Sequence, residues 1–475
     1  MADSHNERQE ATKTPRFVPS VSGVLPDGAL FEMVYRPGDA RSVFVVWEHG
    51  AWRIEPVLRI APLRELIPYS PNNNLIRNGV VLFPSEPEEY DSDQELIAEV
   101  QNFIHRYVDV SPLFEKIASY YVLFSWIYDG FNELPYLRLR GDPGSGKTRF
   151  LLTVGSLCYK PMFASGASTV SPIFRILNAF RGTLIIDEAD FRMSDERAEV
   201  TKILNQGNAR GFPVLRSEVS GKRGEYNPRA YAVFGPKLVA TRRAFEDRAL
   251  ESRCLTEEMG HSKLRDDVPI NLPPSHKEEA LRIRNKLLLF RFRNLHKRRA
   301  VEELVDRAIE PRLNQIFVPL MSIVDDPNAR AELRELARRY NGEMIDERGM
   351  DMEAQVLEVI RDLLAADPSS RLSVKDITDR FIDRHGADFE KKITTRWIGG
   401  VIRRRLNLRT QKSHGVFVIP VPETAKLRRL YEKYGVEFKD PPTEGEVAGD
   451  VPPRVDSGDV QEGKRAGEAS NDLAP

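Results

Sequence analysis

Cysteine is scarce in this sequence, which has only Cys158 and Cys254 among its 475 residues. Two thiols can provide neither a four-thiolate zinc site nor a disulfide framework. We interpret them as free thiols of a reducing compartment, with a single bridge as the alternative. Long apolar runs are also lacking: no stretch approaches the roughly 18 residues that cross a bilayer, and the polar residues 1–16 do not form a secretory signal. These absences predict a cytoplasmic protein with no membrane partner.

The sequence has no excess of charge of one sign. Its 70 lysines and arginines nearly balance 71 aspartates and glutamates, which leaves a formal net charge of −1. A protein that coats nucleic acid through overall positive charge is thereby excluded, so any nucleic-acid contact must come from local basic patches. Hydrophobic residues make up 41% and charged residues 30%, as in soluble globular proteins. The length predicts two or three domains.

Changes of composition divide the chain into segments. Short aromatic and β-branched runs, broken by Pro-Gly and His-Gly, predict strands in the N-terminal part. Apolar strand-like runs then alternate with helical segments, which is typical of an α/β fold with a parallel sheet. The predicted segments are a disordered arm (1–28), a small β-rich N-terminal module (29–90), an α/β core (91–274), further helices (275–350), a C-terminal module (351–439) and a disordered acidic tail (440–475).

The most specific motif matches the phosphate-binding pattern of Gly, four residues, then Gly-Lys-Ser/Thr. Its residues are Gly141, Asp142, Pro143, Gly144, Ser145, Gly146, Lys147 and Thr148, and Arg149 follows them. Glycines let the backbone amides turn toward a phosphate, and the next helix adds its positive N-terminus. Lys147 would reach the outer phosphates, and the Thr148 hydroxyl would bind Mg²⁺. Arg149 is also expected to contact the nucleotide. The alternative is a glycine turn that contains a lysine by chance.

An acidic pair follows an apolar run that reads as a buried parallel strand, residues 183–186. Asp187 would lie at the carboxyl end of this strand, where open α/β sheets bind their ligands. A carboxylate there can hold Mg²⁺, and Glu188 would lie near the γ-phosphate and polarise an attacking water. The alternative is an acidic pair that begins a surface helix.

The order of these segments resembles that of the AAA+ ATPases. In that family a polar residue at the end of the fourth strand contacts the γ-phosphate or the attacking water, and Thr241 matches that place. The family also has an arginine before the fifth strand that reaches the neighbouring subunit's site, for which Arg253 is the first candidate and Arg248 the second. An arginine suits this role because its cation neutralises charge that develops in phosphoryl transfer. The alternative for either arginine is an ion pair within the chain, with a neighbouring carboxylate.

Two further expectations come from the same resemblance. Residues 275–350 would contain the family's helical lid and linker helices, with Arg282 or Arg284 as a nucleotide contact. The insertion at 207–234 contains Arg216 and other basic residues. In helicase-like and initiator-like branches of the family, a hairpin at this place lines a pore and grips DNA. For Arg282 and Arg284, the alternative is an arginine-rich helix that covers another surface. For the insertion, the alternative is a solvent-exposed β-hairpin at a contact between subunits.

Residues 351–420 look like a winged helix. The helix expected at 394–406 buries an apolar face and exposes Arg396, Arg403 and Arg404, and a hairpin with Arg409 and Lys412 would form the wing. Residues 391–412 contain no acid, which suits contact with DNA phosphates. The paired Gly399 and Gly400 depart from the pattern because glycines weaken helices. A winged helix that binds protein is the alternative.

The sequence therefore predicts an α/β protein with a P-loop AAA+ core, a helical lid, a β-rich N-terminal module and a C-terminal winged helix. Together these features resemble replication initiators and replicative helicases of mobile elements. The function expected from this resemblance is that of an ATPase motor that remodels duplex DNA with ATP and Mg²⁺. We expect a homo-oligomeric ring, with a hexamer as one form, and a replication protein as a partner. The alternatives are an ATP-gated DNA-binding regulator with slow turnover and a loader that acts on a protein.

Overall fold

The computed structural model describes residues 16–61, 64–188, 194–220, 225–260, 264–349, 351–367, 372–386 and 393–438. The expected acidic tail at 440–475 and the start of the expected arm lie outside these residues. The chain divides into two compact units, Met1–Gly342 and Glu343–Pro475. Among the described helices, none has the length and apolar character needed to cross a membrane.

The N-terminal part of the first unit consists of two small sheets, with strand orders β2-β3-β4-β5 and β1-β7-β6. Strands begin at Arg16, within the segment expected to be a disordered arm. Residues 16–20 are a strand because they pair in parallel with β7, and such a ladder uses backbone groups that leave no hydrophobic pattern in the sequence. The strands are β1 (Arg16–Ser20), β2 (Ser22–Val24), β3 (Leu30–Arg36), β4 (Arg41–Glu48), β5 (Ala51–Glu55), β6 (Leu58–Ala61) and β7 (Arg64–Pro68), followed by the short helix α1 (Asn74–Arg77).

A five-stranded parallel sheet forms the centre of the first unit, in the order β14-β8-β13-β10-β9. Its strands are apolar because helices cover them, and Leu137, Ile186 and Val239 are almost completely buried. All carboxyl ends of a parallel sheet lie at one edge, so β8, β10 and β13 end side by side. The strands are β8 (Tyr136–Gly141), β9 (Met162–Ser165), β10 (Leu184–Asp187), β13 (Lys237–Thr241) and β14 (Cys254–Met259).

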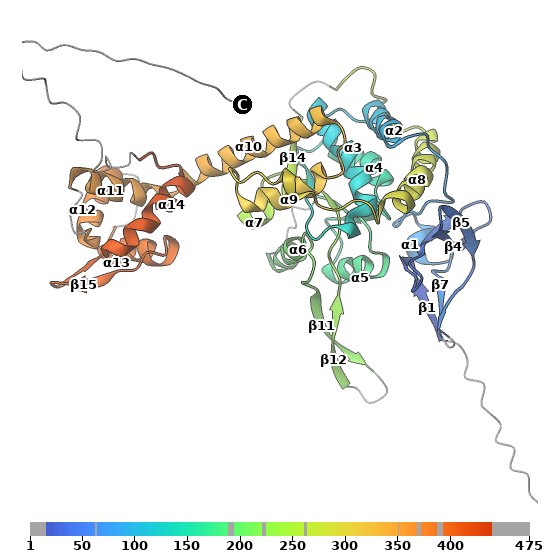
Figure 1. Ribbon diagram of the computed structural model, residues 1–475, viewed down its shortest axis with the longest axis horizontal. Coiled ribbons are helices and arrows are strands. Elements are labelled where there is room, and N and C mark those ends of the chain that lie inside the picture. The colour runs from blue at the N-terminus through green and yellow to red at the C-terminus, as the bar shows by residue number, and fades with distance from the viewer. Residues whose placement is uncertain are drawn as a thin grey trace, which may run out of the picture. The chain divides into compact units, whose positions relative to one another are not determined.

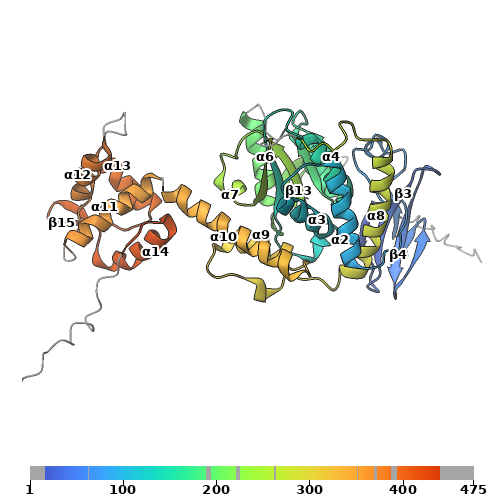
Figure 2. The ribbon, with the colours of Figure 1, turned by 90° about the horizontal axis from the view of Figure 1, so that it is seen from above.

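The helices around this sheet include a bundle in which α8 (Ser275–Asn294) contacts α2, α3 and α4 (Figure 2). The serine side chains of Ser92 and Ser111 cap α2 and α3. The aromatic residues of α3 belong to the core, since Tyr121, Phe124 and Trp126 are fully buried. The remaining helices of this region are α2 (Asp93–Tyr107), α3 (Pro112–Ile127), η1 (Tyr128–Gly130), α4 (Lys147–Leu157), α5 (Val170–Phe180), α6 (Ser194–Gln206), α7 (Arg248–Glu251), η2 (Glu302–Leu304), α9 (Pro311–Met321) and α10 (Pro327–Gly349).

An antiparallel hairpin of β11 (Val214–Ser220) and β12 (Glu225–Tyr231) extends away from the sheet (Figure 1). It lies within the insertion that the sequence placed at 207–234. At its base, the buried Lys237 ammonium donates to the carbonyls of Gly207, Val233 and Gly235 at 3.2, 3.1 and 2.8 Å. This lysine therefore ties both ends of the insertion to the start of β13.

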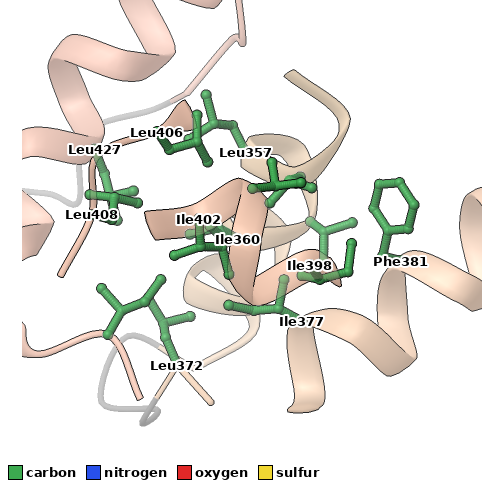
Figure 3. Packing of buried hydrophobic residues seen from close by; sticks show 14 of the residues in the cluster. Leu357, Ile360, Leu372, Ile377, Phe381, Ile398, Ile402, Leu406, Leu408 and Leu427 are labelled. Atoms are coloured by element: carbon green, nitrogen blue, oxygen red, sulfur yellow. The ribbon is translucent and has the colours of Figure 1, made fainter. Parts of the chain in front are cut away.

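The second unit has its own apolar core, shown in Figure 3, to which Ile360, Ile377, Ile398 and Ile402 contribute. The helix expected at 394–406 is split into α13 and a π-helical turn, η4. The amide of Leu406 donates to the carbonyl of Val401, five residues earlier, and this turn directly follows the weak helix formers Gly399 and Gly400. The elements are α11 (Met352–Ala366), α12 (Val374–His385), α13 (Thr395–Gly400), η4 (Val401–Arg405), β15 (Gln411–Ser413), β16 (Val416–Val418), η5 (Val421–Glu423) and α14 (Thr424–Tyr434).

Candidate nucleotide site

The phosphate loop lies between the end of β8 and the start of α4. Gly144 and Gly146 have φ angles of +83° and +94°, which only glycine adopts without strain. Gly146 is also the N-cap of α4, and no side chain caps this helix. The amides of its first turn therefore face the loop without a side-chain acceptor, as a phosphate-binding helix requires.

Lys147 lies inside this loop and is 9% exposed. Its ammonium donates to the carbonyls of Gly141 and Asp142 at 2.6 and 2.7 Å, and to Ser145 Oγ at 3.3 Å. The loop thus curls around the Lys147 ammonium, and backbone carbonyl oxygens hold this group in place. An incoming phosphate would find the amides of α4 and this ammonium on the same side.

Thr148 and Asp187 face each other across the ends of α4 and β10. Thr148 Oγ1 donates to Asp187 Oδ2 at 2.7 Å. A hydroxyl and a carboxylate oxygen at this separation match the donors that Mg²⁺ takes beside a nucleotide. Among the described residues, no three His, Cys, Asp or Glu side chains gather into a metal site. The oxygen pair of Thr148 and Asp187 fits a Mg²⁺ ion whose other ligands would be phosphate and water oxygens.

Glu188 follows in the left-handed conformation, with φ +53°, and its amide donates to Asp187 Oδ1 at 3.0 Å. Its carboxylate is 64% exposed and pairs with Arg242 at 3.0 Å. A cavity of about 330 Å³ joins these residues to the phosphate loop. Its lining consists of Pro143, Gly144, Gly146, Lys147, Thr148, Asp187, Glu188, Ala240, Thr241 and Arg242.

Thr241 ends β13 and is 1% exposed. Its Oγ1 has no hydrogen-bond partner among the residues that the structure describes. A buried hydroxyl without a partner costs about 1–3 kcal/mol. Thr241 is one of the residues that line the cavity, and its contact with the γ-phosphate or the attacking water remains a prediction.

Arg242 was missed in the sequence, although it directly follows Thr241. An arginine at the end of a central parallel strand is the signal that could have identified it. The parallel strands β10 and β13 are neighbours and end at the same edge of the sheet, which brings the Arg242 side chain within 3.0 Å of the Glu188 carboxylate.

Arg149 does not line this cavity. Its guanidinium donates to the carbonyls of Pro269 and Ile270, in the connection between β14 and α8. Its observed contacts are therefore with this connection, whereas the nucleotide contact remains a prediction. Gly141, Asp142 and Ser145, which were also expected to bind the nucleotide, contact Lys147 from the loop as described above.

Arg282 and Arg284, the candidates for a further nucleotide contact, do not line this cavity. The Arg284 guanidinium donates to the carbonyl of Ser156 at 2.8 Å, near the end of α4, and its burial lowers the pKa to about 10. At 1.5 Å per residue, this end of α4 lies roughly 15 Å from the phosphate loop. Arg282 lines a separate groove between α2 and α8. The cause is the packing of α8 in a helical bundle rather than over the cavity.

The two candidate finger arginines also lie outside the lining of this cavity. Arg253 donates to Asn208 Oδ1 at 2.8 Å, to Asn205 Oδ1 at 2.5 Å and to the carbonyl of Ala249, and burial lowers its pKa. The carboxylate of Glu251, a neighbour that could have paired with Arg253, instead binds Arg138. Arg248 is exposed at the start of α7. Neither arginine therefore lines the nucleotide cavity of its own subunit.

The arginines and lysine that the sequence assigned to DNA lie on two surfaces. In the second unit, all five are exposed: Arg396, Arg403, Arg404, Arg409 and Lys412. Arg403 lies over the ring of Phe417 in the β15–β16 hairpin, at 5.7 Å from its centroid. Arg216 lies on the other hairpin, β11–β12, where it pairs with Glu199 at 3.2 Å and lies over Phe174. Lys222 and Arg223, which lie between these two strands in the sequence, are outside the described residues.

Comparison with known proteins finds no family model and no curated protein that matches the chain. Solved structures match with low overall similarity. An MCM homologue from Methanopyrus kandleri is 12% identical, with 68% of this chain and 76% of that one covered and a TM-score of 0.34. The C-terminal region of NrS-1 is 10% identical, with 82% and 95% covered and a TM-score of 0.34. The Aeropyrum pernix ORC1 protein, solved in complex with DNA, is 14% identical, with 72% and 94% covered and a TM-score of 0.20.

Proposed function

We propose that this protein is an ATP-hydrolysing AAA+ motor that acts on DNA and remodels or separates duplex. The proposal rests on one observation: residues of the phosphate loop line the same cavity as Asp187, Glu188 and Thr241. A loop for phosphates, an oxygen pair for Mg²⁺, a carboxylate and an unsatisfied buried hydroxyl are the groups needed for hydrolysis of a nucleoside triphosphate.

In the proposed mechanism, Lys147 and the first-turn amides of α4 bind the outer phosphates and neutralise their charge. Thr148 and Asp187 would hold Mg²⁺, which would neutralise phosphate charge and polarise the γ-phosphate. Glu188 accepts a proton from the attacking water, and Thr241 orients that water or the γ-phosphate through its hydroxyl. Each of these residues lies on the carboxyl edge of the parallel sheet or at the start of α4.

We further propose that the site is completed by a second copy of the chain. Arg253 does not line its own subunit's cavity, and its guanidinium is held by two asparagines rather than by a carboxylate. Its positive charge is therefore not neutralised by a direct ion pair with Glu251. Such a cation can stabilise charge in a neighbour's site, which supports a homo-oligomeric ring.

DNA is the proposed partner because exposed basic side chains lie on two elements suited to it. The β11–β12 hairpin extends from the sheet, and in the second unit the α13 and η4 segment carries Arg396, Arg403 and Arg404 beside a β-hairpin. We interpret the second unit as a winged helix whose arginines contact phosphates.

An ATP-gated regulator with slow turnover is the second candidate. The ion pair between Glu188 and Arg242 favours it, because a carboxylate that is bound by an arginine of its own chain must leave that arginine before it can act on water. A loader that acts on a protein partner would use the same catalytic residues, and stimulation by that partner would identify it.

Steady-state ATP hydrolysis with and without single- and double-stranded DNA tests these functions. Lys147→Ala and Glu188→Gln should each abolish hydrolysis, whereas Arg243→Ala, an exposed neighbour outside the cavity lining, should not. Strong DNA stimulation that both variants lose supports the motor. Slow hydrolysis that ignores DNA, together with tight DNA binding, favours the regulator. Absence of hydrolysis at high protein concentration would contradict the assignment of Asp187 and Glu188.

A further inference from the structure

A half-exposed aromatic ring lies on the β15–β16 hairpin, which projects from the edge of the second unit (Figure 1). Phe417 in β16 is 51% exposed, whereas Val418 and Ile419, which follow it, are 6% and 5% exposed. The ring therefore adds little to the packing of this unit. The phosphate contacts proposed for the arginines of the unit make no use of it.

The hairpin holds this ring in a fixed place. His414 and Gly415 form its two-residue turn, with φ angles of +48° and +87°. Two positive φ angles in such a turn match the twist of the paired strands. Beyond β16, the amide of Ile419 donates to the carbonyl of Leu372 at 2.9 Å. Backbone contacts therefore fix the position of Phe417, although its own ring is not buried.

Two cations flank the ring. Arg403 in η4 lies over it, with the guanidinium carbon 5.7 Å from the ring centroid. Lys412 in β15 is the cross-strand partner of Phe417, which places both side chains on one face of the hairpin. The described residues 393–412 contain no aspartate or glutamate. The surface around the ring therefore suits an anionic ligand.

Neighbouring residues hold Arg403 beside the ring. Its Nη1 atom donates to Thr410 Oγ1 at 3.3 Å. A Cβ atom at Gly399 would lie 3.0 Å from both terminal nitrogens of the guanidinium, so a larger residue there would push this group away. This contact gives a reason for a glycine inside α13, where glycine weakens the helix. Because half of the Phe417 side chain remains exposed, the ring surface that Arg403 does not cover is open to solvent.

We propose that Phe417 is a stacking site for an unpaired nucleobase, and that Arg403 and Lys412 bind the phosphates beside that base. The second unit then binds single-stranded DNA, or the opened part of a duplex, in preference to intact duplex. The inference rests on the proposed function, in which DNA is the partner of this unit, and it specifies the form of DNA that the unit binds.

The chemistry of the site distinguishes unpaired bases from paired ones. An unpaired base exposes a π-face that can stack on an aromatic ring, and such stacking contributes strongly to the binding of single strands. Within an intact duplex each base already stacks on its neighbours, so the same contact would first require unstacking. Cations alone bind the phosphates of either form. A ring flanked by two cations therefore favours a strand with unpaired bases.

DNA binding by the full chain without nucleotide tests the proposal, because this measurement does not depend on ATP hydrolysis. Fluorescence anisotropy would give the affinities for an oligothymidylate of about 20 nucleotides and for a blunt duplex of about 20 base pairs. Phe417→Ala should weaken single-strand binding about tenfold and leave duplex binding within about twofold, because only the stacking contact is lost. Lys412→Ala should weaken the binding of both forms alike, because it removes a phosphate contact.

Further variants of the same position separate stacking from packing. Phe417→Trp keeps an aromatic face and should retain the single-strand affinity. Phe417→Leu keeps an apolar side chain without that face and should behave like Phe417→Ala. Phe17→Ala is the matched control, because Phe17 in β1 of the first unit is exposed to a similar extent, 55%. It should change neither affinity.

Photo-cross-linking provides a direct readout of stacking. An oligothymidylate that contains iododeoxyuridine should form a cross-link to Phe417 under ultraviolet light, and mass spectrometry would identify the cross-linked peptide. The same probe should not be cross-linked at this position in the Phe417→Leu variant. Cross-links of the bound wild-type protein that map only to other residues would contradict the stacking site.

Other outcomes separate this inference from the proposed function. Equal weakening of single-strand and duplex binding by Phe417→Ala would mean that the ring only supports the hairpin, which overturns the proposal. An unchanged single-strand affinity in that variant would overturn it as well. Either result would leave the proposed function intact if DNA still stimulates ATP hydrolysis by the wild-type protein. A wild-type protein that binds neither form of DNA would defeat both.

Discussion

The carboxylate of Glu32 in β3 accepts a hydrogen bond from Arg291 Nε in α8 at 2.6 Å, across the boundary between the N-terminal strands and the helical bundle. Tyr159 and Lys160 bind the same carboxylate, at 2.7 and 2.9 Å. All four side chains are buried. A buried charge network therefore attaches the N-terminal strands to the α/β core.

Removing Glu32 should destabilise the first unit strongly. Glu32→Ala leaves two buried cations without their shared partner, and breaking a buried pair in this way costs about 3–5 kcal/mol. Chemical denaturation would measure this loss of unfolding free energy. Glu86→Ala is the control, because it removes an exposed pair with Arg36 and should cost at most about 1 kcal/mol. Similar small losses in both variants would contradict a structural role for the network.

The stability of the protein should rise with pH between about 7 and 10. Burial lowers the pKa of Lys237 to about 7, and that of Lys160 to about 8, whereas an unfolded lysine titrates near 10.4. Between these values the unfolded chain binds more protons than the folded one, so raising the pH favours folding. Below the lower pKa values, both states bind the same protons and this dependence ends.

Lys237→Met should remove part of that rise, because methionine fills a similar volume without a titrating group. Denaturation at pH 7, 8, 9 and 10 would compare its slope with those of wild type and of Lys116→Met, whose lysine is exposed and pairs with Glu332. The Lys116 variant should keep the wild-type slope. A wild-type slope in the Lys237 variant would show that this lysine stays charged through its three carbonyl contacts.

Thr241→Val should separate function from stability. The variant deletes a buried hydroxyl without a partner in the described part of the chain, so the unfolding free energy should stay the same or rise by about 1 kcal/mol. ATP hydrolysis should fall by about tenfold to a hundredfold, because the hydroxyl can no longer orient the water or the γ-phosphate. Both quantities would be measured on the same preparation. Full activity in a stable variant would remove Thr241 from the mechanism.

The sequence predicted the phosphate loop and the acidic pair because each is a contiguous motif whose chemistry depends on neighbouring residues. Arg242 could not be assigned in this way, since its contact with Glu188 depends on the pairing of β10 with β13. The position of Arg284 has a related cause. The resemblance suggested a helical lid at residues 275–350 but not which helices this segment contacts, and α8 packs with α2, α3 and α4, where Arg284 binds the carbonyl of Ser156.

Loss of Arg253 should be rescued by mixing subunits if sites form between copies of the chain. Arg253→Ala should lose hydrolysis, as should Lys147→Ala. In a mixed ring, an intact phosphate loop of the first variant can meet an intact Arg253 of the second, so activity should return. Hydrolysis would be followed as the two proteins are titrated together at constant total concentration. No recovery, despite co-assembly shown by light scattering, would instead assign Arg253 to holding Asn205 and Asn208 within its own subunit.

Exposed arginines of the second unit should contribute to DNA affinity in a salt-dependent way. The variants Arg403→Ala and Arg404→Ala remove cations from the turn that follows α13. If each contacts one phosphate, the slope of log affinity against log salt should decrease by about one per variant. Arg384→Ala is the matched control, because Glu358 and Asp362 already neutralise that arginine, and its slope should match wild type. Equal effects of all three variants, or none, would favour the alternative in which this unit binds a protein.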